Sequence, residues 1–223
     1  MQTQTKLSRR QMLSMSLALS GYALASPMSH LFAQERPRRT PDQIVGPFYP
    51  VMRPLDEDAD LITIRGRSGR AAGQVVHLSG RVLDLKGNPV PGALVEIWQA
   101  NTHGRYTHPN DRNPAPLDSN FEGFGVQKTD AKGRFRFKTI KPGSYFAPSL
   151  GTLRTPHIHF QVTSGPVRFV TQMYFAGEKL NDTDHELQSA ANKELLIAKY
   201  LPPARDLEPD SLIANWDIVI IGS

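Results

Sequence analysis

The chain has 223 residues, 39% of them hydrophobic, which is enough for one domain with a sizeable core. It contains no cysteine, and this excludes disulfides, thiolate metal sites and cysteine nucleophiles. The formal net charge is +5, but residues 1–33 carry Lys6, Arg9 and Arg10 and no acidic residue. The remainder has 23 basic and 21 acidic residues, so we do not expect a nucleic-acid partner.

Residues 1–33 have the layout of an export signal. Ser8-Arg9-Arg10 precedes a weakly apolar run from Met12 to Ala25, which ends in the small-x-small cleavage site Ala23-Leu24-Ala25; Ala33 is a second candidate cleavage site. The run is too short and too rich in Ser and Gly to span a bilayer stably. Because the arginine pair resembles a twin-arginine signal, we expect export of the folded protein to the periplasm or the medium. The alternative is a disordered basic start.

The rest of the chain predicts short strands with little helix. Residues 34–74 form an extended arm, because the prolines of Gly46-Pro47-Phe48-Tyr49-Pro50 prevent regular structure. Alternating apolar residues and Gly/Pro turns then predict strands at 75–84, 93–98, 134–138, 156–162, 169–175 and 215–221. A short helix is expected within 184–200, and the long irregular segment 101–125 is of the kind that usually carries function. The predicted fold class is all-β, a β-sandwich of mixed short strands with long irregular active-site loops.

Two histidines and two tyrosines are the candidate chemical groups. In His157-Ile158-His159 the two imidazoles point to one face of a strand, roughly 6–7 Å apart, and can chelate a metal ion. The alternative is a pair of ordinary polar strand residues. Tyr106 lies in the irregular segment and Tyr145 follows a turn, and alone each would be interpreted as a core or interface aromatic residue.

Several spaced motifs resemble the intradiol ring-cleavage dioxygenases. They are Leu78-x-Gly80-x-Val82, Gly87, Val90, Val95-Glu96-Ile97, Gly104-x-Tyr106, residues 94–125, Lys141-Pro142-Gly143-Ser144-Tyr145, Arg154-Thr155-Pro156-His157-Ile158-His159-Phe160 and Thr171-Gln172-Met173-Tyr174-Phe175. The resemblance covers about residues 40–220 and is nearest to the protocatechuate branch of the family. Phe146-Ala147 stand where that branch has Pro-Trp, which puts the substrate pocket in doubt but not the metal site.

The resemblance implies a ferric ion held by Tyr106, Tyr145, His157 and His159. A free phenol has a pKa of about 10, so a strong Lewis acid is needed to keep it ionised at neutral pH. The implied reaction opens the ring of a catechol with dioxygen, between the two hydroxyl-bearing carbons, to a cis,cis-muconate. No organic cofactor is implied, and a homo-oligomer is a possible assembly.

Arg154 and Gln172 are the catalytic residues that the resemblance implies. Arg154 lies three residues before His157, at the start of the predicted strand, from where its guanidinium can approach a metal-bound ligand. An arginine is always protonated, which makes it a poor metal ligand and a good partner for an oxyanion. Without the resemblance, the two would be an ordinary surface arginine and an ordinary strand glutamine.

Two other readings remain open from the sequence. The strand-and-turn pattern also resembles transthyretin-like and carboxypeptidase-regulatory β-sandwiches, which are binding modules without iron. A zinc hydrolase could use the same histidines, although no Glu or Asp is placed as an obvious third ligand or base. The expected organisation is a signal at 1–33, an arm at 34–74 and a catalytic β-sandwich domain at 75–223.

Overall fold

The structure is a computed structural model that describes residues 37–53, 58–148 and 150–222. The expected export signal at 1–33 lies outside these residues. Among the described residues, no helix is both long enough and apolar enough to cross a membrane.

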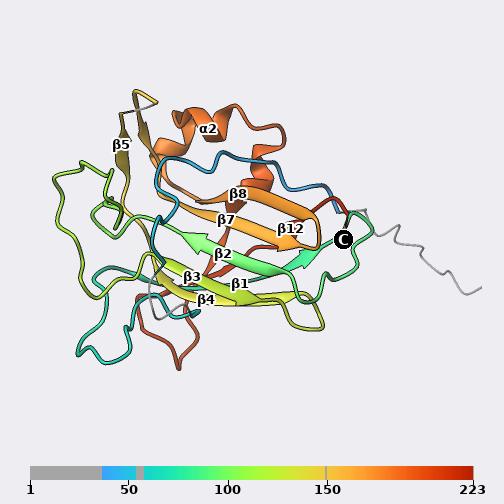
Figure 1. Ribbon diagram of the computed structural model, residues 1–223, viewed down its shortest axis with the longest axis horizontal. Coiled ribbons are helices and arrows are strands. Elements are labelled where there is room, and N and C mark those ends of the chain that lie inside the picture. The colour runs from blue at the N-terminus through green and yellow to red at the C-terminus, as the bar shows by residue number, and fades with distance from the viewer. Residues whose placement is uncertain (1–36, 54–57, 149, 223) are drawn as a thin grey trace, which may run out of the picture. The chain divides into compact units, whose positions relative to one another are not determined.

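The described part of the chain contains two five-stranded sheets (Figure 1). The first contains β1 (Val75–Leu83), β4 (Arg134–Ile140), β10 (Tyr200–Leu201), β11 (Leu212–Asn215) and β12 (Ile218–Val219). The second has the order β3-β2-β7-β8-β9, with β2 (Leu94–Trp98), β3 (Phe124–Lys128), β7 (His157–Ser164), β8 (Val167–Phe175) and β9 (Ile197–Ala198). A separate hairpin pairs β5 (Tyr145–Ala147) with β6 (Thr152–Arg154). The all-β sandwich prediction is confirmed.

The hydrophobic core lies between the two sheets and follows from alternation along the strands. Val95 and Ile97 of β2 and Ile158 and Phe160 of β7 are fully buried in one cluster with residues of β1 and β4. Burying each large apolar side chain contributes about 1.5–3 kcal/mol, so the sandwich holds the two sheets firmly together. The other face of β2 and β7 is therefore free to present polar side chains, which include both histidines.

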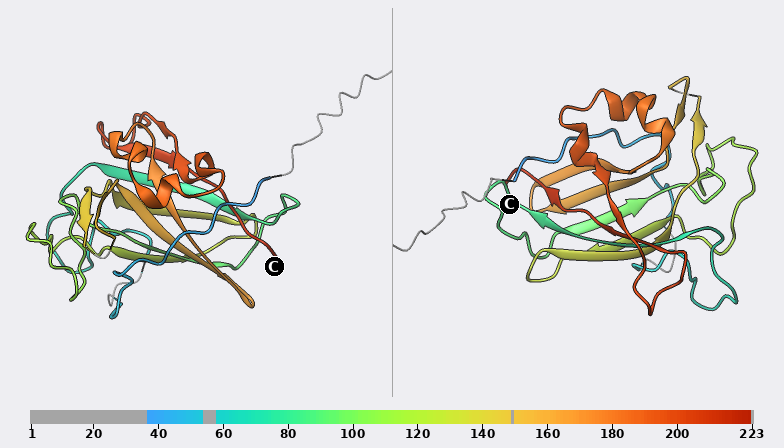
Figure 2. Two further views of the ribbon diagram at one scale, coloured as in Figure 1. Left: turned by 90° about the horizontal axis from the view of Figure 1, so that it is seen from above. Right: turned by 180° about the vertical axis from the view of Figure 1, so that it is seen from behind.

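Short helical turns cover one side of the second sheet (Figure 2). They are η1 (Lys179–Asp182), α2 (His185–Gln188) and η2 (Lys193–Leu196). The short helix expected within 184–200 is confirmed as one turn, α2, with the 3-10 turn η2 after it. The segment then forms two short strands: β9 extends the second sheet beside β8, and β10 pairs with β11 in the first sheet.

The last predicted strand, 215–221, is wrong as a single element. The chain instead forms β11 and β12, which pair in parallel with successive parts of β1. The interruption occurs at Trp216 and Asp217, where the Arg81 backbone N–H donates to the Asp217 carboxylate at 2.8 Å and so leaves the strand ladder. Strand β3 and the β5–β6 hairpin were not predicted.

Residues 41–46 of the arm pack along the second sheet, whereas Ala59 and Leu61 hydrogen-bond to Lys138 of β4 in the first sheet. The arm residues that the structure describes form no strand. The Gln43 N–H donates to the Val170 carbonyl at 3.0 Å, and the Thr171 hydroxyl donates to the Pro41 carbonyl at 2.9 Å. Figure 1 shows this blue segment running past β7 and β8 toward β5. The arm therefore covers the sheet face that carries the histidines.

Candidate metal centre

The two histidines are placed by the register of the second sheet. On β8, Tyr174 stands opposite His157 and Gln172 stands opposite His159, while Trp98 of β2 is the other neighbour of His159. The Trp98 ring stacks on the His159 ring, with centroids 4.9 Å apart and planes 10° apart. Both imidazoles are 2% exposed, and cross-strand neighbours hold His159 from two strands and His157 from β8.

The two tyrosines come from an irregular loop and from the start of the β5–β6 hairpin. Tyr106 lies in the irregular segment, and its N–H donates to the Asp111 carboxylate at 2.7 Å. Tyr145 begins β5, after the irregular residues 141–144. The two loops touch at Gly104, where φ is +76° and an added Cβ would lie 2.2 Å from the Ser144 carbonyl oxygen. This close approach requires glycine and brings the two phenols together.

The structure brings all four predicted ligands into one cluster. The Nε2 atoms of His157 and His159 are 3.2 Å apart, and the Tyr145 hydroxyl is 3.5 Å from His157 Nε2. The rings of Tyr106 and Tyr145 are 5.3 Å apart at 86°. The buried Tyr106 hydroxyl has no hydrogen-bond partner among the described residues. Two imidazole nitrogens and two phenol oxygens thus converge from three segments of the chain.

The donor chemistry of this cluster fits a hard trivalent metal ion. Burial and the Arg154 charge lower the pKa of His157 well below its usual value, and burial, His157 and Arg154 do the same for His159. Both imidazoles are therefore neutral, and His157 Nδ1 lies 2.6 Å from the Thr155 carbonyl, which leaves the Nε2 lone pair toward the cluster. Burial raises the pKa of both tyrosines, so ionising them requires a strongly charged metal.

No group of three or more His, Cys, Asp or Glu side chains suited to a metal occurs within the described ranges. The donors beside the histidine pair are instead the two tyrosines. Such a set suits ferric iron better than the nitrogen-rich or thiolate sites of zinc. The zinc-hydrolase reading is therefore not favoured.

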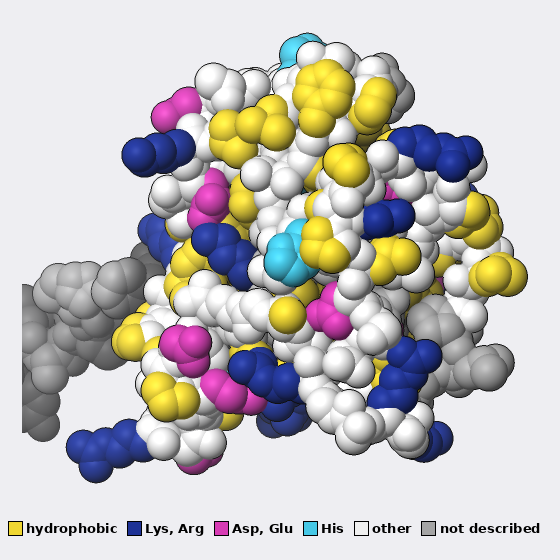
Figure 3. Space-filling model, turned by 90° about the vertical axis from the view of Figure 1, so that its left-hand side faces the viewer, with side chains coloured by type: hydrophobic (Ala, Val, Ile, Leu, Met, Phe, Trp, Pro, Cys, Tyr) yellow, Lys and Arg dark blue, Asp and Glu magenta, His cyan; other side chains and the backbone are white. Residues whose placement is uncertain are grey.

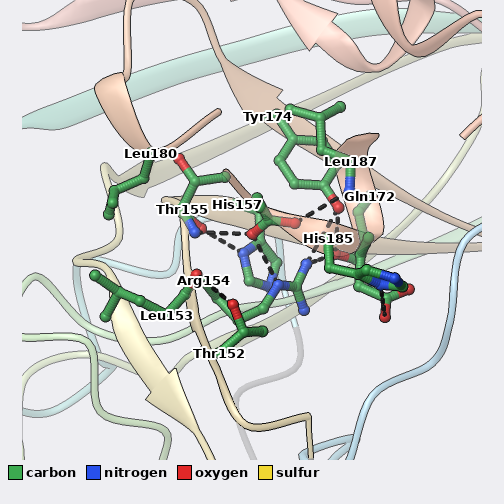
Figure 4. Close-up of polar contacts among 12 residues, drawn as sticks. Thr152, Leu153, Arg154, Thr155, His157, Gln172, Tyr174, Leu180, His185 and Leu187 are labelled. Atoms are coloured by element: carbon green, nitrogen blue, oxygen red, sulfur yellow. Dashed lines mark hydrogen bonds and ion pairs between the residues drawn. The ribbon is translucent and has the colours of Figure 1, made fainter. Parts of the chain in front are cut away.

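Arg154 lies beside the cluster but not where the sequence suggested. It ends β6 and stands opposite Tyr145 in the hairpin ladder, rather than starting the histidine strand. The physical reason is Pro156, which has no N–H for a ladder bond and separates the two strands. Figure 4 shows the Arg154 side chain beside the His157 ring, directed toward Gln172 and Tyr174. The hairpin therefore brings Arg154 to the tyrosine side of the site.

Gln172 is fully buried, and both ends of its amide are engaged. Its Oε1 accepts from Arg154 Nη2 at 2.8 Å, and its Nε2 donates to the Ile44 carbonyl at 2.9 Å. Gln172 thus links Arg154 to the arm. This arrangement holds the guanidinium and leaves the catalytic role assigned to Gln172 from sequence as a prediction.

The arm closes the cluster from the side opposite the core. The Phe48 ring lies 4.8 Å from that of Tyr106 and 6.1 Å from that of Tyr145. Gly46, with φ of +73°, approaches the His159 ring so closely that a Cβ would lie 3.0 Å from Cε1. Ala147 is 1% exposed and belongs to the same packed cluster as the tyrosines, whereas Phe146 is 58% exposed. Ala147, and not Phe146, therefore borders the site.

Figure 3 shows the end of the molecule at which the β5–β6 hairpin lies, with hydrophobic side chains gathered over its upper part and Lys and Arg both at its edges and within the face. On the hairpin, Phe146 and Leu153 stand opposite one another and are both exposed. The hairpin is thus two-sided, with Tyr145 and Arg154 facing the cluster.

Sequence reasoning missed three residues that organise the site. Asn101 is buried, and its side-chain oxygen accepts from the His103 and Arg105 N–H groups and so shapes the Tyr106 loop. Asp111 holds the Tyr106 backbone, and Asp184 binds Arg154. The pattern Asn101-x-x-Gly104 was a readable turn signal, but the partners of Asp111 and Asp184 were not recoverable from spacing.

Comparisons with known proteins show which family the chain belongs to. A family model described as Dioxygenase matches residues 44–222. The chain is 41% identical over 174 residues to the protocatechuate 3,4-dioxygenase beta chain of Burkholderia cepacia, covering 76% of this chain and 73% of the relative. It is 33% identical to the hydroxyquinol 1,2-dioxygenase of Rhodococcus opacus over 62% of this chain and to catechol 1,2-dioxygenase 1 of Acinetobacter lwoffii over 63%. It spans about half the length of those two relatives, at 47% and 48%.

Solved structures of dioxygenases share the fold of this chain. The dioxygenase domain of a carbohydrate-binding fusion protein from Streptomyces sp. SirexAA-E superposes with a TM-score of 0.63 at 29% identity, covering 83% of this chain and 100% of that domain. An intradiol ring-cleavage dioxygenase from Tetranychus urticae shares the fold, with a TM-score of 0.65 at 21% identity over 83% of this chain and 95% of the other. An iron-free sandwich module is therefore not favoured. The chain belongs to the intradiol ring-cleavage dioxygenase family, whose members open catechol rings with dioxygen.

Proposed function

We propose that this chain opens a protocatechuate-like catechol to a cis,cis-muconate at a ferric ion held by Tyr106, Tyr145, His157 and His159. The observation that carries the proposal is the convergence of these four side chains, with the two imidazole Nε2 atoms 3.2 Å apart and the Tyr106 hydroxyl left without a partner among the described residues.

The four ligands would divide the work by chemistry. A ferric ion, when bound, supplies Lewis acidity that ionises bound hydroxyl groups and withdraws electron density from the ring. The neutral histidines donate lone pairs and hold position. The phenolate oxygens of Tyr106 and Tyr145 neutralise charge, and either can take up a proton from an arriving catechol.

Arg154 serves the reaction and not the metal in this proposal. Its Nη1 makes no hydrogen bond within the described part of the chain, whereas Nε and Nη2 are both engaged. Nη1 can therefore stabilise negative charge that develops on the substrate. Phe48 and Trp98 line the ligand cluster with apolar surface, which excludes water and strengthens that interaction.

The substrate proposal rests on the Burkholderia relative, which is named for protocatechuate. Ala147 borders the ligand cluster, and its small side chain selects for no particular ring substituent. Purified protein should be coloured by tyrosinate-to-iron charge transfer and should consume dioxygen with protocatechuate, catechol or hydroxyquinol. Metal analysis, the visible spectrum and product identification test this. A colourless protein holding zinc, or no ring opening of any catechol, would contradict the proposal.

We further propose that residues 1–33 direct export by the twin-arginine route, as the Arg9-Arg10 pair suggests. A fusion of residues 1–36 to a reporter should leave the cytoplasm only where the twin-arginine machinery is present. Changing both arginines to lysine should block export while leaving the charge unchanged. If the double change is exported normally, the general secretory route is used instead.

A further inference from the structure

Asp184 makes three hydrogen bonds that tie separate parts of the site together. Its Oδ2 accepts from Arg154 Nε at 2.8 Å and from the Thr155 backbone N–H at 2.9 Å. Its Oδ1 accepts from the Leu187 N–H at 3.1 Å and so caps α2. Asp184 is 0% exposed and Arg154 is 1% exposed, so this is a fully buried ion pair.

Residues of β8 hold the Arg154 guanidinium from a second direction. Arg154 Nη2 donates to Gln172 Oε1 at 2.8 Å and to the Tyr174 hydroxyl at 3.1 Å, and the Tyr174 hydroxyl donates to the Gln43 side chain at 2.8 Å. Three of the five N–H groups of the guanidinium are therefore bound along its Nε–Nη2 edge. The two N–H groups on Nη1 are left over, at the other end of a rigid plane.

We propose that Asp184 is a positioning residue that fixes the Arg154 guanidinium, so that its unengaged Nη1 faces the metal centre and the bound substrate. The inference rests on the proposed function, since it assigns Arg154 to the reaction. A buried arginine with a single flexible partner can rotate, whereas this one is held from two elements. Small misplacements of a charge-stabilising group reduce rates strongly, by up to about 10²-fold for a shift of 1 Å.

A double-mutant cycle tests whether Asp184 acts through Arg154. The four proteins are the wild type, Asp184→Asn, Arg154→Gln and the double variant. Arg154→Gln should lower kcat by about 10²–10³-fold, as for the loss of one oxyanion donor. Asp184→Asn should lower kcat by about 10²-fold, with KM changed far less, because the charge remains but is no longer aimed. In the Arg154→Gln background, Asp184→Asn should change kcat less than about twofold.

Thermal unfolding keeps the test decisive if Asp184→Asn is unstable. Each single variant leaves one buried charge without its partner and should have a lower unfolding temperature than the wild type. The double variant removes both charges, so its unfolding temperature should recover in part. Leu187→Ala is the control for a purely structural role, because it loosens α2 without touching Arg154. It should lower the midpoint and leave kcat within a few-fold.

A readout independent of activity is the Nε–H signal of Arg154 in ¹⁵N NMR of the full chain loaded with diamagnetic Ga³⁺. That proton should exchange slowly in the wild type and fast in Asp184→Asn. If the wild type opens no catechol, the proposed function fails. The exchange rates would still show whether Asp184 fixes the Arg154 guanidinium. Equal exchange rates, or an equal kcat loss from Asp184→Asn in both backgrounds, would overturn the inference.

Discussion

The two halves of the ligand set are built in different ways. His157 and His159 stand on β7, where β8 pairs with both residues and β2 pairs with His159 on the other side. Tyr106 comes from a loop held by Asn101 and Asp111, and Tyr145 comes from the short β5–β6 hairpin, which this loop touches at Gly104. The histidine side is therefore set by strand register, and the tyrosine side depends on a few local contacts. Changes far from the metal should disturb the tyrosines more readily than the histidines.

The largest expected effect comes from the ligands. His157→Ala or His159→Ala should lose most of the iron, because each removes a neutral nitrogen donor that no neighbour replaces. Tyr106→Phe or Tyr145→Phe should retain more of the metal and change the visible band, since each phenolate contributes charge transfer. Metal analysis and the absorption spectrum of the same preparation measure both effects. Wild-type iron and colour in any of the four would remove that residue from the ligand set.

Gly104→Ala tests the loop side directly. A Cβ there would collide with the Ser144 carbonyl and lie 3.2 Å from Tyr145 Cβ, at a φ of +76°. We expect a loss of about 1–3 kcal/mol of stability and a weaker charge-transfer band per iron, because the two phenols move apart. Gly177→Ala is the matched control, with φ of +80° and no atom within 4 Å of the added Cβ. If both variants behave alike, backbone strain alone explains the result.

Gly46→Ala is the corresponding test of the histidine side and should have a smaller effect. The added Cβ would lie 3.0 Å from His159 Cε1, so the ring must move by only a few tenths of an ångström. We expect iron affinity to fall by about 10-fold at most, below the 10–100-fold typical for lost ligand support, because the sheet still holds His159. Gly92→Ala, with φ of +72° and open space, controls for strain. A larger loss of iron in Gly46→Ala than in Gly104→Ala would show that the histidine side is the more easily disturbed of the two.

The sequence predicted the histidine side better than the tyrosine side for the same physical reason. The alternation of apolar residues in β1, β2, β7 and β8 was readable, and a period of two places His157 and His159 on one face. Tyr106 and Tyr145 could be chosen only from family resemblance, because loop contacts have no periodic signature. The Asp184–Arg154 pair was missed for a related reason. It joins residues 30 positions apart through a hairpin and a one-turn helix, and neither was predicted in detail.

The smallest expected effect lies on the first sheet, and it tests whether the site is independent of distant surface charge. Glu208 pairs with His77 at 2.7 Å and with Lys138 at 2.9 Å, and hydrogen bonds from these partners lower its pKa to about 2. A carboxyl whose pKa is lowered by folding stabilises the fold above its unfolded pKa of about 4.3. That contribution disappears as the pH falls toward 2.

Glu208→Gln should therefore reduce the free energy of unfolding by about 0–1 kcal/mol at pH 7, since surface ion pairs are weak. The difference from the wild type should shrink as the pH falls from about 4.3 toward the folded-state pKa, because the wild-type carboxyl then becomes neutral too. Urea unfolding of both proteins between pH 3 and 7 measures it. Iron content and colour at pH 7 should match the wild type, because none of the four ligands contacts Glu208. A spectral change in this variant would show that a charge change on the sheet holding β1 and β4 alters the metal centre. Strand register alone would then not be enough to fix the histidines.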